Sequence, residues 1–318
     1  MSQRALITGS SGFVGGHLAE HLLACGDQVL GVAPAAPPPA TGRPLPEGVA
    51  SVLFDLTAAD PFPPESRRQI RDFAPTHIYH LAAISVPQEC GQQEPSPLAW
   101  QINVAGVERV LQLALQLPLV PRLFFTSTSH VYQPVNREAP YVDEQAPQGP
   151  INAYGRTKWA AEQLLLEAAR KEQAEVVIVR SFKHTGPGQG PQMMVPEWAA
   201  QFVAGADPVV IRSRSSYLDL CDVRDVVRAY RLLAEKGQSG EAYNVGSGLN
   251  RSSGEIFDCL QKLADPNRRM TEIRPMFKQE PIADISKIHL HCDWQPQIAL
   301  EQTLTDTLGW WQQRGGKP

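Results

Sequence analysis

The chain of 318 residues lacks any long hydrophobic run, and its charge is nearly balanced. No stretch approaches the roughly 18 apolar residues of a membrane span, and the N-terminal residues pass straight into a glycine pattern instead of a signal peptide. The formal net charge is -4, whereas a nucleic-acid partner requires clustered lysine and arginine for its phosphates. We therefore expect neither a membrane nor a nucleic acid as partner.

The sequence also has little cysteine, with five residues that form no C-x-x-C pair. An odd number of scattered thiols is typical of a reduced, cytoplasmic protein and argues against a zinc site or a disulfide framework. We expect core or surface thiols, no metal and a cytoplasmic location. The five residues are Cys25, Cys90, Cys221, Cys259 and Cys292.

Proline, in contrast, is abundant: 28 residues, against a usual share of about 5%. One proline-rich patch spans residues 34–46, and most other prolines lie between expected strands and helices. None interrupts an expected helix or central strand. The excess therefore indicates stiffened loops, most of them at the carboxyl ends of strands, where an open α/β sheet binds its ligands.

Short apolar runs alternate with helical patterns along the first half of the chain. Strands are expected at residues 4–8, 28–32, 51–56, 78–82, 123–126 and 176–179, and helices at residues 14–25, 97–117 and 154–172. Shorter elements follow: a helix at 196–204, a strand at 209–211, a helix at 222–235, a strand at 242–245, a helix opening at Ser252 and a last helix at 300–313. Ser252 and Glu255 have the spacing of a capping box.

This alternation predicts an α/β fold with a Rossmann-type, doubly wound parallel sheet and helices on both faces. A smaller C-terminal α/β lobe is expected beside it. We assign residues 1–180 to the sheet domain, with residues 215–245 returning to it. The lobe, which we expect to bind the substrate, then consists of residues 181–214 and 246–318.

Three glycines, Gly9, Gly12 and Gly15, lie between the first expected strand and the first expected helix. At this place, G-x-x-G-x-x-G spacing is typical of a dinucleotide site. One glycine forms the tight turn, one lets the backbone approach the pyrophosphate, and one lets helix and strand pack closely. Together with Ser11, Phe13 and Val14, these residues are expected to bind the cofactor at the helix N-terminus.

The second strand is expected to select between NAD and NADP, because an acidic residue at its end would bind the adenosine ribose. That end reads Val32, Ala33 and Pro34, without an acid, which favours NADP over NAD. Arg43 is the only cation in the following loop; it can reach a 2′-phosphate or be an ordinary exposed arginine. Asp55 and Leu56 end the third expected strand, where a side chain can meet the adenine edge.

Tyr154 and Lys158 are four residues apart at the start of an expected helix and therefore share one face. A free tyrosine has a pKa near 10, too high for acid–base work at neutral pH. A neighbouring ammonium favours the phenolate, so we expect Lys158 to lower the pKa of Tyr154.

Taken together, these motifs resemble the extended short-chain dehydrogenase/reductases, the NAD-dependent epimerase/dehydratase family, that act on nucleotide sugars. The resemblance covers nearly the whole chain. Within the family, the segments 180–189, 217–223 and 293–296 are most similar to the group of GDP-4-keto-6-deoxy-mannose reductases and GDP-mannose 4,6-dehydratases. The motifs that carry it are the glycine loop, residues 80–83, Asn103, residues 127–129, Tyr154 with Lys158, and residues 243–246.

The resemblance implies a role for each matching residue. Thr128 would hydrogen-bond the C4 oxygen of the sugar while Tyr154 exchanges a proton, and Lys158 would also hold the nicotinamide ribose. Further cofactor contacts are implied for Leu81, Ala82, Ala83, Asn103, Ser181 and His184. Substrate contacts are implied for Ser85, Ser129, Lys183, His184, Arg214 and Arg274.

The reaction depends on what precedes Tyr132. Dehydratase relatives carry a carboxylate pair there, whereas this chain has Ser129 and His130, which disfavours dehydration. His130, with an ordinary pKa near 6.5, can take part in catalytic proton transfer or merely line the pocket. His184 can bind substrate or be a packed structural histidine.

Two residues depart from the pattern of many relatives: Lys183 replaces an asparagine and Ser215 an arginine, both of which usually help hold the nucleotide diphosphate. Lys183, Arg212 and Arg214 can compensate as charges for phosphate. The nucleotide, GDP or another, is therefore open.

Three functions fit. The first is an NAD(P)H-dependent reductase acting on the C4 keto group of a GDP-4-keto-6-deoxy-hexose. The second is a nucleotide-sugar epimerase that keeps its NAD(P) tightly bound, and the third is a non-catalytic dinucleotide-binding sensor. The resemblance also implies a homodimer through the helices at 97–117 and 154–172, with Leu164, Leu165 and Leu166 either at that interface or in the core.

Overall fold

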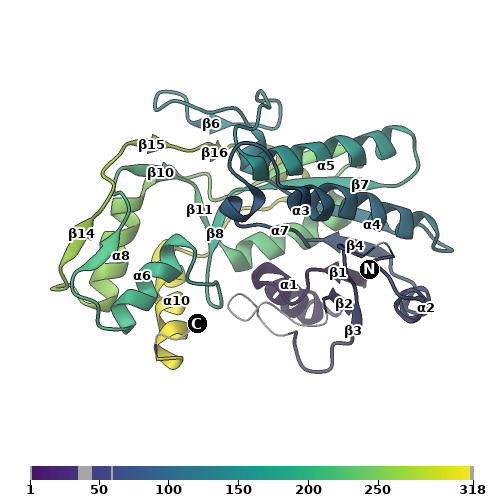
Figure 1. Ribbon diagram of the computed structural model, residues 1–318, viewed down its shortest axis with the longest axis horizontal. Coiled ribbons are helices and arrows are strands. Elements are labelled where there is room, and N and C mark those ends of the chain that lie inside the picture. The colour runs from purple at the N-terminus through teal and green to yellow at the C-terminus, as the bar shows by residue number, and fades with distance from the viewer. Residues whose placement is uncertain (1, 35–44, 59, 316–318) are drawn as a thin grey trace.

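The computed structural model describes residues 2–34, 45–58 and 60–315 (Figure 1). Its centre is a sheet of seven parallel strands in the order β12-β7-β5-β4-β1-β2-β3. The expected α/β fold with a Rossmann-type parallel sheet is confirmed. The strands are β1 (Arg4–Thr8), β2 (Gln28–Ala33), β3 (Ser51–Leu53), β4 (His77–His80), β5 (Arg122–Thr128), β7 (Val176–Ser181) and β12 (Glu241–Val245).

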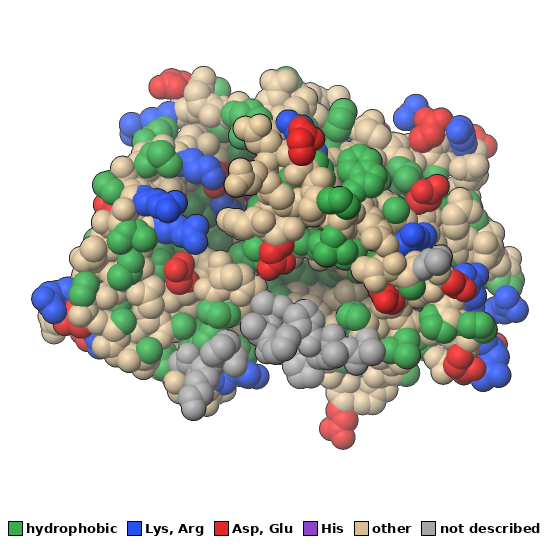
Figure 2. All heavy atoms as spheres, viewed as in Figure 1, with side chains coloured by type: hydrophobic (Ala, Val, Ile, Leu, Met, Phe, Trp, Pro, Cys, Tyr) green, Lys and Arg blue, Asp and Glu red, His purple; other side chains and the backbone are tan. Residues whose placement is uncertain are grey.

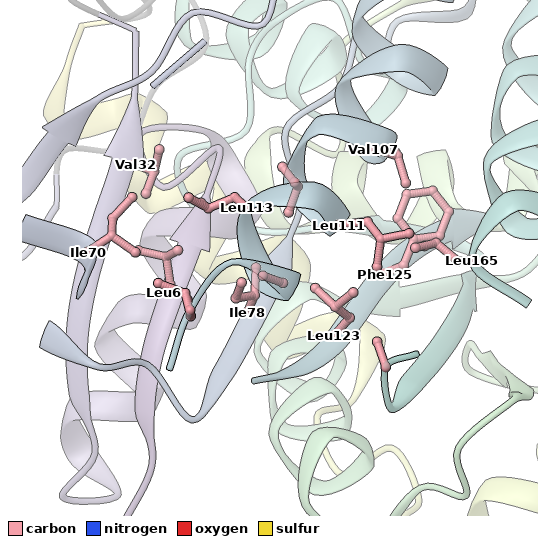
Figure 3. Close-up of a cluster of buried hydrophobic side chains, with 14 of the residues drawn as sticks. Leu6, Val32, Ile70, Ile78, Val107, Leu111, Leu113, Leu123, Phe125 and Leu165 are labelled. Atoms are coloured by element: carbon pink, nitrogen blue, oxygen red, sulfur yellow. The ribbon is translucent and has the colours of Figure 1, made fainter. Parts of the chain in front are cut away.

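Helices cover both faces of this sheet. One face packs against α2 (Pro64–Phe73), α4 (Gly106–Leu115) and α5 (Ala153–Arg170), and part of this core is drawn in Figure 3. The other face packs against α1 (Phe13–Ala24), α7 (Val223–Lys236) and α9 (Ser286–Cys292). Along β1, Leu6 enters the first core while Ala5 and Ile7 enter the second, because successive strand side chains point to opposite faces.

A second lobe has its own core, in which Trp198, Phe257 and Trp311 are buried. Its helices are α6 (Met194–Val203), α8 (Ser253–Ala264) and α10 (Leu300–Gln313). The capping box of Ser252 and Glu255 is confirmed at the start of α8. Two small sheets complete the lobe: β9 (Val209–Ile211) with β14 (Met270–Glu272), and β10 (Ser216–Leu218) between β13 (Arg251–Ser252) and β15 (Lys278–Gln279).

Two further strand pairs connect the lobe to the sheet domain. β8 (Lys183–Thr185) runs parallel to β11 (Leu220–Asp222), and β6 (Tyr141–Val142) runs parallel to β16 (Ile282–Ala283). α9 packs against α7 and β12, so this part of the segment that we assigned to the lobe lies on the sheet domain. The exact division of the chain stays a prediction.

Several expected elements differ in the structure. The expected helix 97–117 is three pieces: α3 (Pro97–Trp100), a π-helical segment (Gln101–Ala105) and α4. The strand expected at 51–56 ends at Leu53, because the Asp55 carboxylate accepts a hydrogen bond from the Thr57 amide, at 2.8 Å, and bends the chain. The helix α2, which follows this bend, was not among the expected elements.

An ion pair inside the protein fastens α5 to the sheet. Arg180 on β7 and Glu162 on α5 are both buried, and their charged groups lie 2.9 Å apart. Arg180 also donates to the Tyr132 hydroxyl, at 3.2 Å, and that hydroxyl donates to Asn244 on β12, at 2.6 Å. The middle of α5 is therefore held against β7.

We predict that Glu162→Gln lowers the free energy of unfolding by about 3–5 kcal/mol, because it leaves the Arg180 charge buried without its partner. Chemical denaturation measures this loss. Glu167→Gln on the same helix is the matched control, since its partners Arg170 and Lys171 lie at the surface and such pairs contribute within about 1 kcal/mol. Equal, small losses in both variants would contradict the importance of the buried pair.

Candidate active site

Two glycines of the motif, Gly9 in the loop between β1 and α1 and Gly15 in the first turn of α1, have no room for a side chain. Gly9 has φ +73°, and a Cβ atom on it would lie 2.8 Å from the Ala82 nitrogen. A Cβ atom on Gly15 would lie 2.2 Å from the Gly9 carbonyl oxygen. The Gly9 contact brings the backbone of the loop against the segment that follows β4, and the Gly15 contact packs the first turn of α1 against the loop.

The N-terminus of α1 is open to a ligand. Its N-cap residue is Gly12, and no side chain caps the first amides of the helix. Ser11, Gly12, Phe13 and Val14 are partly accessible, as a pyrophosphate-binding loop requires. The arrangement therefore fits a dinucleotide, with Leu81, Ala82 and Ala83 on the other side of the loop.

The structure describes only some of the residues that we expected to contact the adenosine of the cofactor. Arg43 lies outside the described residues. Asp55 is exposed and bound to Thr57, so its contact with adenine stays a prediction. The Leu56 side chain is buried in the core against Gly106, and its contact with the adenine edge also stays a prediction.

The catalytic candidates meet at the carboxyl end of β5. Thr128 is the last residue of β5, and Tyr154 and Lys158 lie in the first two turns of α5. Asn152 caps this helix, accepting the Gly155 amide at 2.8 Å. Lys158 is buried; its ammonium donates to the Thr126 carbonyl, at 2.8 Å, and lies 4.7 Å from the centre of the Phe125 ring.

The pKa of Tyr154 is not lowered as expected. Burial raises the pKa of this phenol well above 10, and a hydrogen bond with Thr128 opposes the shift only partly. The reason is that the Lys158 ammonium points to the Thr126 carbonyl and not to the phenol. Burial in turn lowers the pKa of Lys158 to about 8. At neutral pH the pair is therefore a protonated tyrosine beside a lysine close to its titration.

Asn103, an expected cofactor contact, is bound to the protein itself. Its amide accepts from the Ile84 nitrogen, at 2.8 Å, and donates to the Ile84 carbonyl and to the Thr157 hydroxyl, both at 3.1 Å. Thr157 donates to the Tyr154 carbonyl, at 2.8 Å. Asn103 therefore links the loop after β4 to the catalytic helix from within the π-helical segment, a local feature that is frequent at functional sites.

The two histidines near the site are neutral at pH 7. Burial and the charge of Lys183 lower the pKa of His130 to about 4, and burial lowers the pKa of His184. His130 lies edge-on to Tyr154, with ring centres 5.9 Å apart. His184 stacks on Phe13 at 6.2 Å and contacts the Phe182 carbonyl, at 2.9 Å, so it lies beside the cofactor loop.

Three serines were also expected to contact the cofactor or the substrate. The Ser181 hydroxyl is buried and paired with the Tyr230 hydroxyl at 2.6 Å, so its expected cofactor contact would have to come from the backbone. Ser129 is buried beside Thr128, and Ser85 is exposed in the loop after β4.

Two cations expected to hold the diphosphate are paired with carboxylates instead. Arg214 binds Asp258 through two hydrogen bonds of 2.8 and 2.7 Å. Lys183 and Lys278 both bind Glu280; burial raises the pKa of Glu280, but the two lysines prevail and hold it at about 2. We expected Lys183 and Arg214 to bind the diphosphate of the substrate. Their charges are already bound by carboxylates of the protein, which would compete with that diphosphate.

The lobe also contains a cavity of about 280 Å³, whose lining includes Glu197, Arg212 and Arg274, the last of which was expected to contact the substrate. In Figure 2, Lys and Arg side chains gather over the part of the lobe that carries β10, β14 and β15. Sequence reasoning missed Glu197. No spacing signal marks it, because only the packing of α6 against β9 brings it to Arg212.

The glycine loop at the edge of a parallel sheet and the neighbouring Thr128, Tyr154 and Lys158 define a dinucleotide-binding oxidoreductase of the short-chain dehydrogenase type. The NAD dependent epimerase/dehydratase family matches residues 5–246, and the chain belongs to this family.

Individual relatives carry different activities. The GDP-6-deoxy-D-mannose reductase of Pseudomonas aeruginosa is 28% identical over 99% of both chains. The structure of RMD from Pseudomonas aeruginosa, complexed with NADPH, has a TM-score of 0.82 at 28% identity and covers 99% of both chains. The UDP-glucose 4-epimerase of Thermus thermophilus, in complex with NAD, has a TM-score of 0.83 at 26% identity over 96% of this chain and 98% of that one.

Within the part of the chain that the structure describes, no helix is both long and apolar enough to cross a membrane.

We predict that cofactor affinity falls as the pH rises through about 8, because Lys158 loses its proton there and an ammonium is the better donor to a ribose hydroxyl. Titration of NADPH fluorescence between pH 6 and 10 measures this. Lys158→Met has no group to titrate and should give a weaker, flat profile. A wild-type profile as flat as that of the variant would contradict the assignment.

Proposed function

We propose that the protein reduces the C4 keto group of a GDP-linked 4-keto-6-deoxy-hexose with NADPH. The observation that carries the proposal is the protonated Tyr154 beside Thr128 at the end of β5, with no carboxylate at positions 129 and 130. Similarity to a GDP-6-deoxy-D-mannose reductase over the full chain supports the same reaction.

The chain's own residues perform the proton chemistry. The Thr128 hydroxyl donates to the C4 carbonyl oxygen and orients it. The phenol of Tyr154 then transfers its proton to this oxygen, which becomes the C4 hydroxyl. When bound, the dinucleotide would supply the hydride that carbon C4 receives. Lys158, whose ammonium donates to the Thr126 carbonyl, would hold the nicotinamide ribose.

His130 argues against reactions that need a base at a sugar carbon. The Asn152 carbonyl oxygen accepts from Gly155, so its NH2 group faces the His130 ring and donates to Nδ1 at 2.8 Å. A neutral His130 then carries its proton on Nε2 and presents a donor, not a base. Dehydration and epimerisation by deprotonation of a sugar carbon both need a base at that carbon, whereas epimerisation at C4 by hydride transfer does not. This arrangement therefore supports reduction over dehydration and over epimerisation by proton transfer.

The choice of NADPH follows from the end of β2, where Val32 and Ala33 are buried and no acidic side chain is present to repel a 2′-phosphate. The NADPH complex of the Pseudomonas aeruginosa relative supports it. A cytoplasmic location stays a prediction.

We also propose a homodimer. Leu165 is buried in the sheet core, and the partly buried Leu164 and Leu166 pack against that core, so the core accounts for much of this leucine run. Trp100 on α3 and Trp159 on α5 are instead 48% and 40% exposed on neighbouring helices. Large exposed aromatic residues of this kind are typical of interfaces between subunits.

We predict that Tyr154→Phe lowers the turnover of NADPH with a GDP-4-keto-6-deoxy-hexose by a factor of about 10² or more, because the proton donor is removed. Absorbance at 340 nm follows the reaction. Cofactor affinity should change little, since Lys158 is kept. Tyr141→Phe, an exposed tyrosine on β6, is the control and should keep wild-type rates. Undiminished turnover in Tyr154→Phe would exclude the mechanism.

A further inference from the structure

Three charged side chains are buried in the layer between α5 and the strands β5 and β7. Lys158 and Glu162 on α5 are 2% and 0% exposed, and Arg180 on β7 is 2% exposed. Lys158 and Glu162 are four residues apart, so their side chains lie on one face of the helix, one turn from each other. Two cations therefore share this layer with the Glu162 carboxylate.

Apolar side chains form much of the same layer. The Lys158 ammonium lies 4.7 Å from the centre of the Phe125 ring, and Phe125 belongs to one core with Leu165 of α5 (Figure 3). Charges in such surroundings are screened far less than charges at the surface. A buried cation here depends on a nearby anion or acceptor to keep its proton.

The two cations are not held equally well. Nε and Nη2 of Arg180 donate to the Glu162 carboxylate, at 3.2 and 2.9 Å. Nη1 donates to the Tyr132 hydroxyl, at 3.2 Å, and to a backbone carbonyl, at 3.1 Å. Within the described part of the chain, the Lys158 ammonium donates to one oxygen, the carbonyl of Thr126. Its charge therefore depends more on the field of its surroundings.

The titratable groups around Lys158 come from several elements: His80 from β4, Cys90 from the loop after β4, and Tyr154 and Glu162 from α5 itself. Burial raises the pKa of the Cys90 thiol above its ordinary 9.0 and also raises the pKa of Tyr154. Burial, helped by the charge of Lys158, lowers the pKa of His80 to about 3. These three groups are therefore neutral at pH 7, and Glu162 is the anion of the set.

We infer that Glu162 is a positioning residue for the cofactor, because its carboxylate keeps Lys158 charged where the nicotinamide ribose would be held. The inference deepens the proposed function and rests on it, since the ribose contact of Lys158 is part of that proposal. Burial lowers the pKa of Lys158 to about 8, and the charge of Glu162 opposes this shift. A purely structural Glu162 would stabilise the fold and leave the titration of Lys158 unchanged.

The test is the titration of Lys158 in the full chain without cofactor, followed by NMR of lysine labelled with ¹³C at Cε. The Lys158 signal is identified by its absence from Lys158→Met. We expect this signal to titrate near pH 8 in the wild type. In Glu162→Gln the midpoint should fall by about one pH unit or more, because the opposing charge is lost.

Two further variants separate the charge from the structure. Glu162→Asp keeps a carboxylate and should keep the midpoint close to that of the wild type, even where chemical denaturation shows a lower stability. Glu167→Gln is the matched control on the same helix. It removes a carboxylate that pairs with Arg170 and Lys171 at the surface, and should leave the midpoint unchanged.

Because Glu162→Gln leaves the Arg180 charge without its partner, a variant without either charge is also titrated. The double variant Glu162→Gln/Arg180→Met removes the whole pair, a change that buried ion pairs often tolerate. The midpoint of Lys158 should still lie below that of the wild type, since the carboxylate on its own helix is gone. A wild-type midpoint in Glu162→Gln, or in the double variant where the single variant does not fold, would overturn the inference.

The consequence for the cofactor is measured by titration of NADPH fluorescence over the same pH range. The affinity of Glu162→Gln should fall at a lower pH than that of the wild type, by the shift that NMR gives for Lys158. At pH values well below both midpoints the two affinities should agree, because Lys158 is charged in both proteins. Identical pH profiles of the two proteins would overturn the inference.

These measurements separate the inference from the proposed function, because neither needs a sugar or a hydride transfer. If the midpoint shifts as expected but no 4-keto sugar is reduced, the role of Glu162 holds and the proposed reaction fails. If Tyr154-dependent reduction is observed while the midpoint in Glu162→Gln is that of the wild type, only the inference is wrong.

Discussion

The site depends on one close contact between backbones. Strand order reverses between β1 and β4, and at that point Gly9 approaches Ala82 so closely that no side chain fits between them. The reversal opens a crevice at the carboxyl ends of the strands, which is where open α/β sheets bind ligands. The N-terminus of α1, the end of β5 and the start of α5 all face this edge, so cofactor loop and catalytic side chains meet without further insertions.

Burial shifts the pKa values of the site residues more than interactions between their charges do. Tyr154 remains protonated because its surroundings disfavour a phenolate, while Lys158 is brought near its titration point. A phenol that holds its proton is suited to reduction, in which it must donate, and His130 is fixed as a donor by Asn152. The buried pair of Arg180 and Glu162 keeps α5, and with it Tyr154, in place against the sheet.

Local patterns in the sequence were enough to predict the glycine loop, the shared helix face of Tyr154 and Lys158, and the capping box of α8. Each depends on residues within about one helical turn or one loop. Contacts between distant segments were not accessible: Arg214 with Asp258, Lys183 with Glu280, and Asn103 with Ile84 all join separate elements. For the same reason, no sequence signal marked the place of Glu197 beside Arg212.

The central claim, reduction at C4, is tested most directly by isotope transfer. The protein is incubated with a GDP-4-keto-6-deoxy-hexose and NADPH carrying deuterium at the transferred position, and the product is examined by mass spectrometry and NMR. The account predicts one deuterium on C4 of the sugar for each NADPH oxidised. A product without deuterium, formed while the cofactor stays bound and unconsumed, would contradict reduction and identify an epimerase.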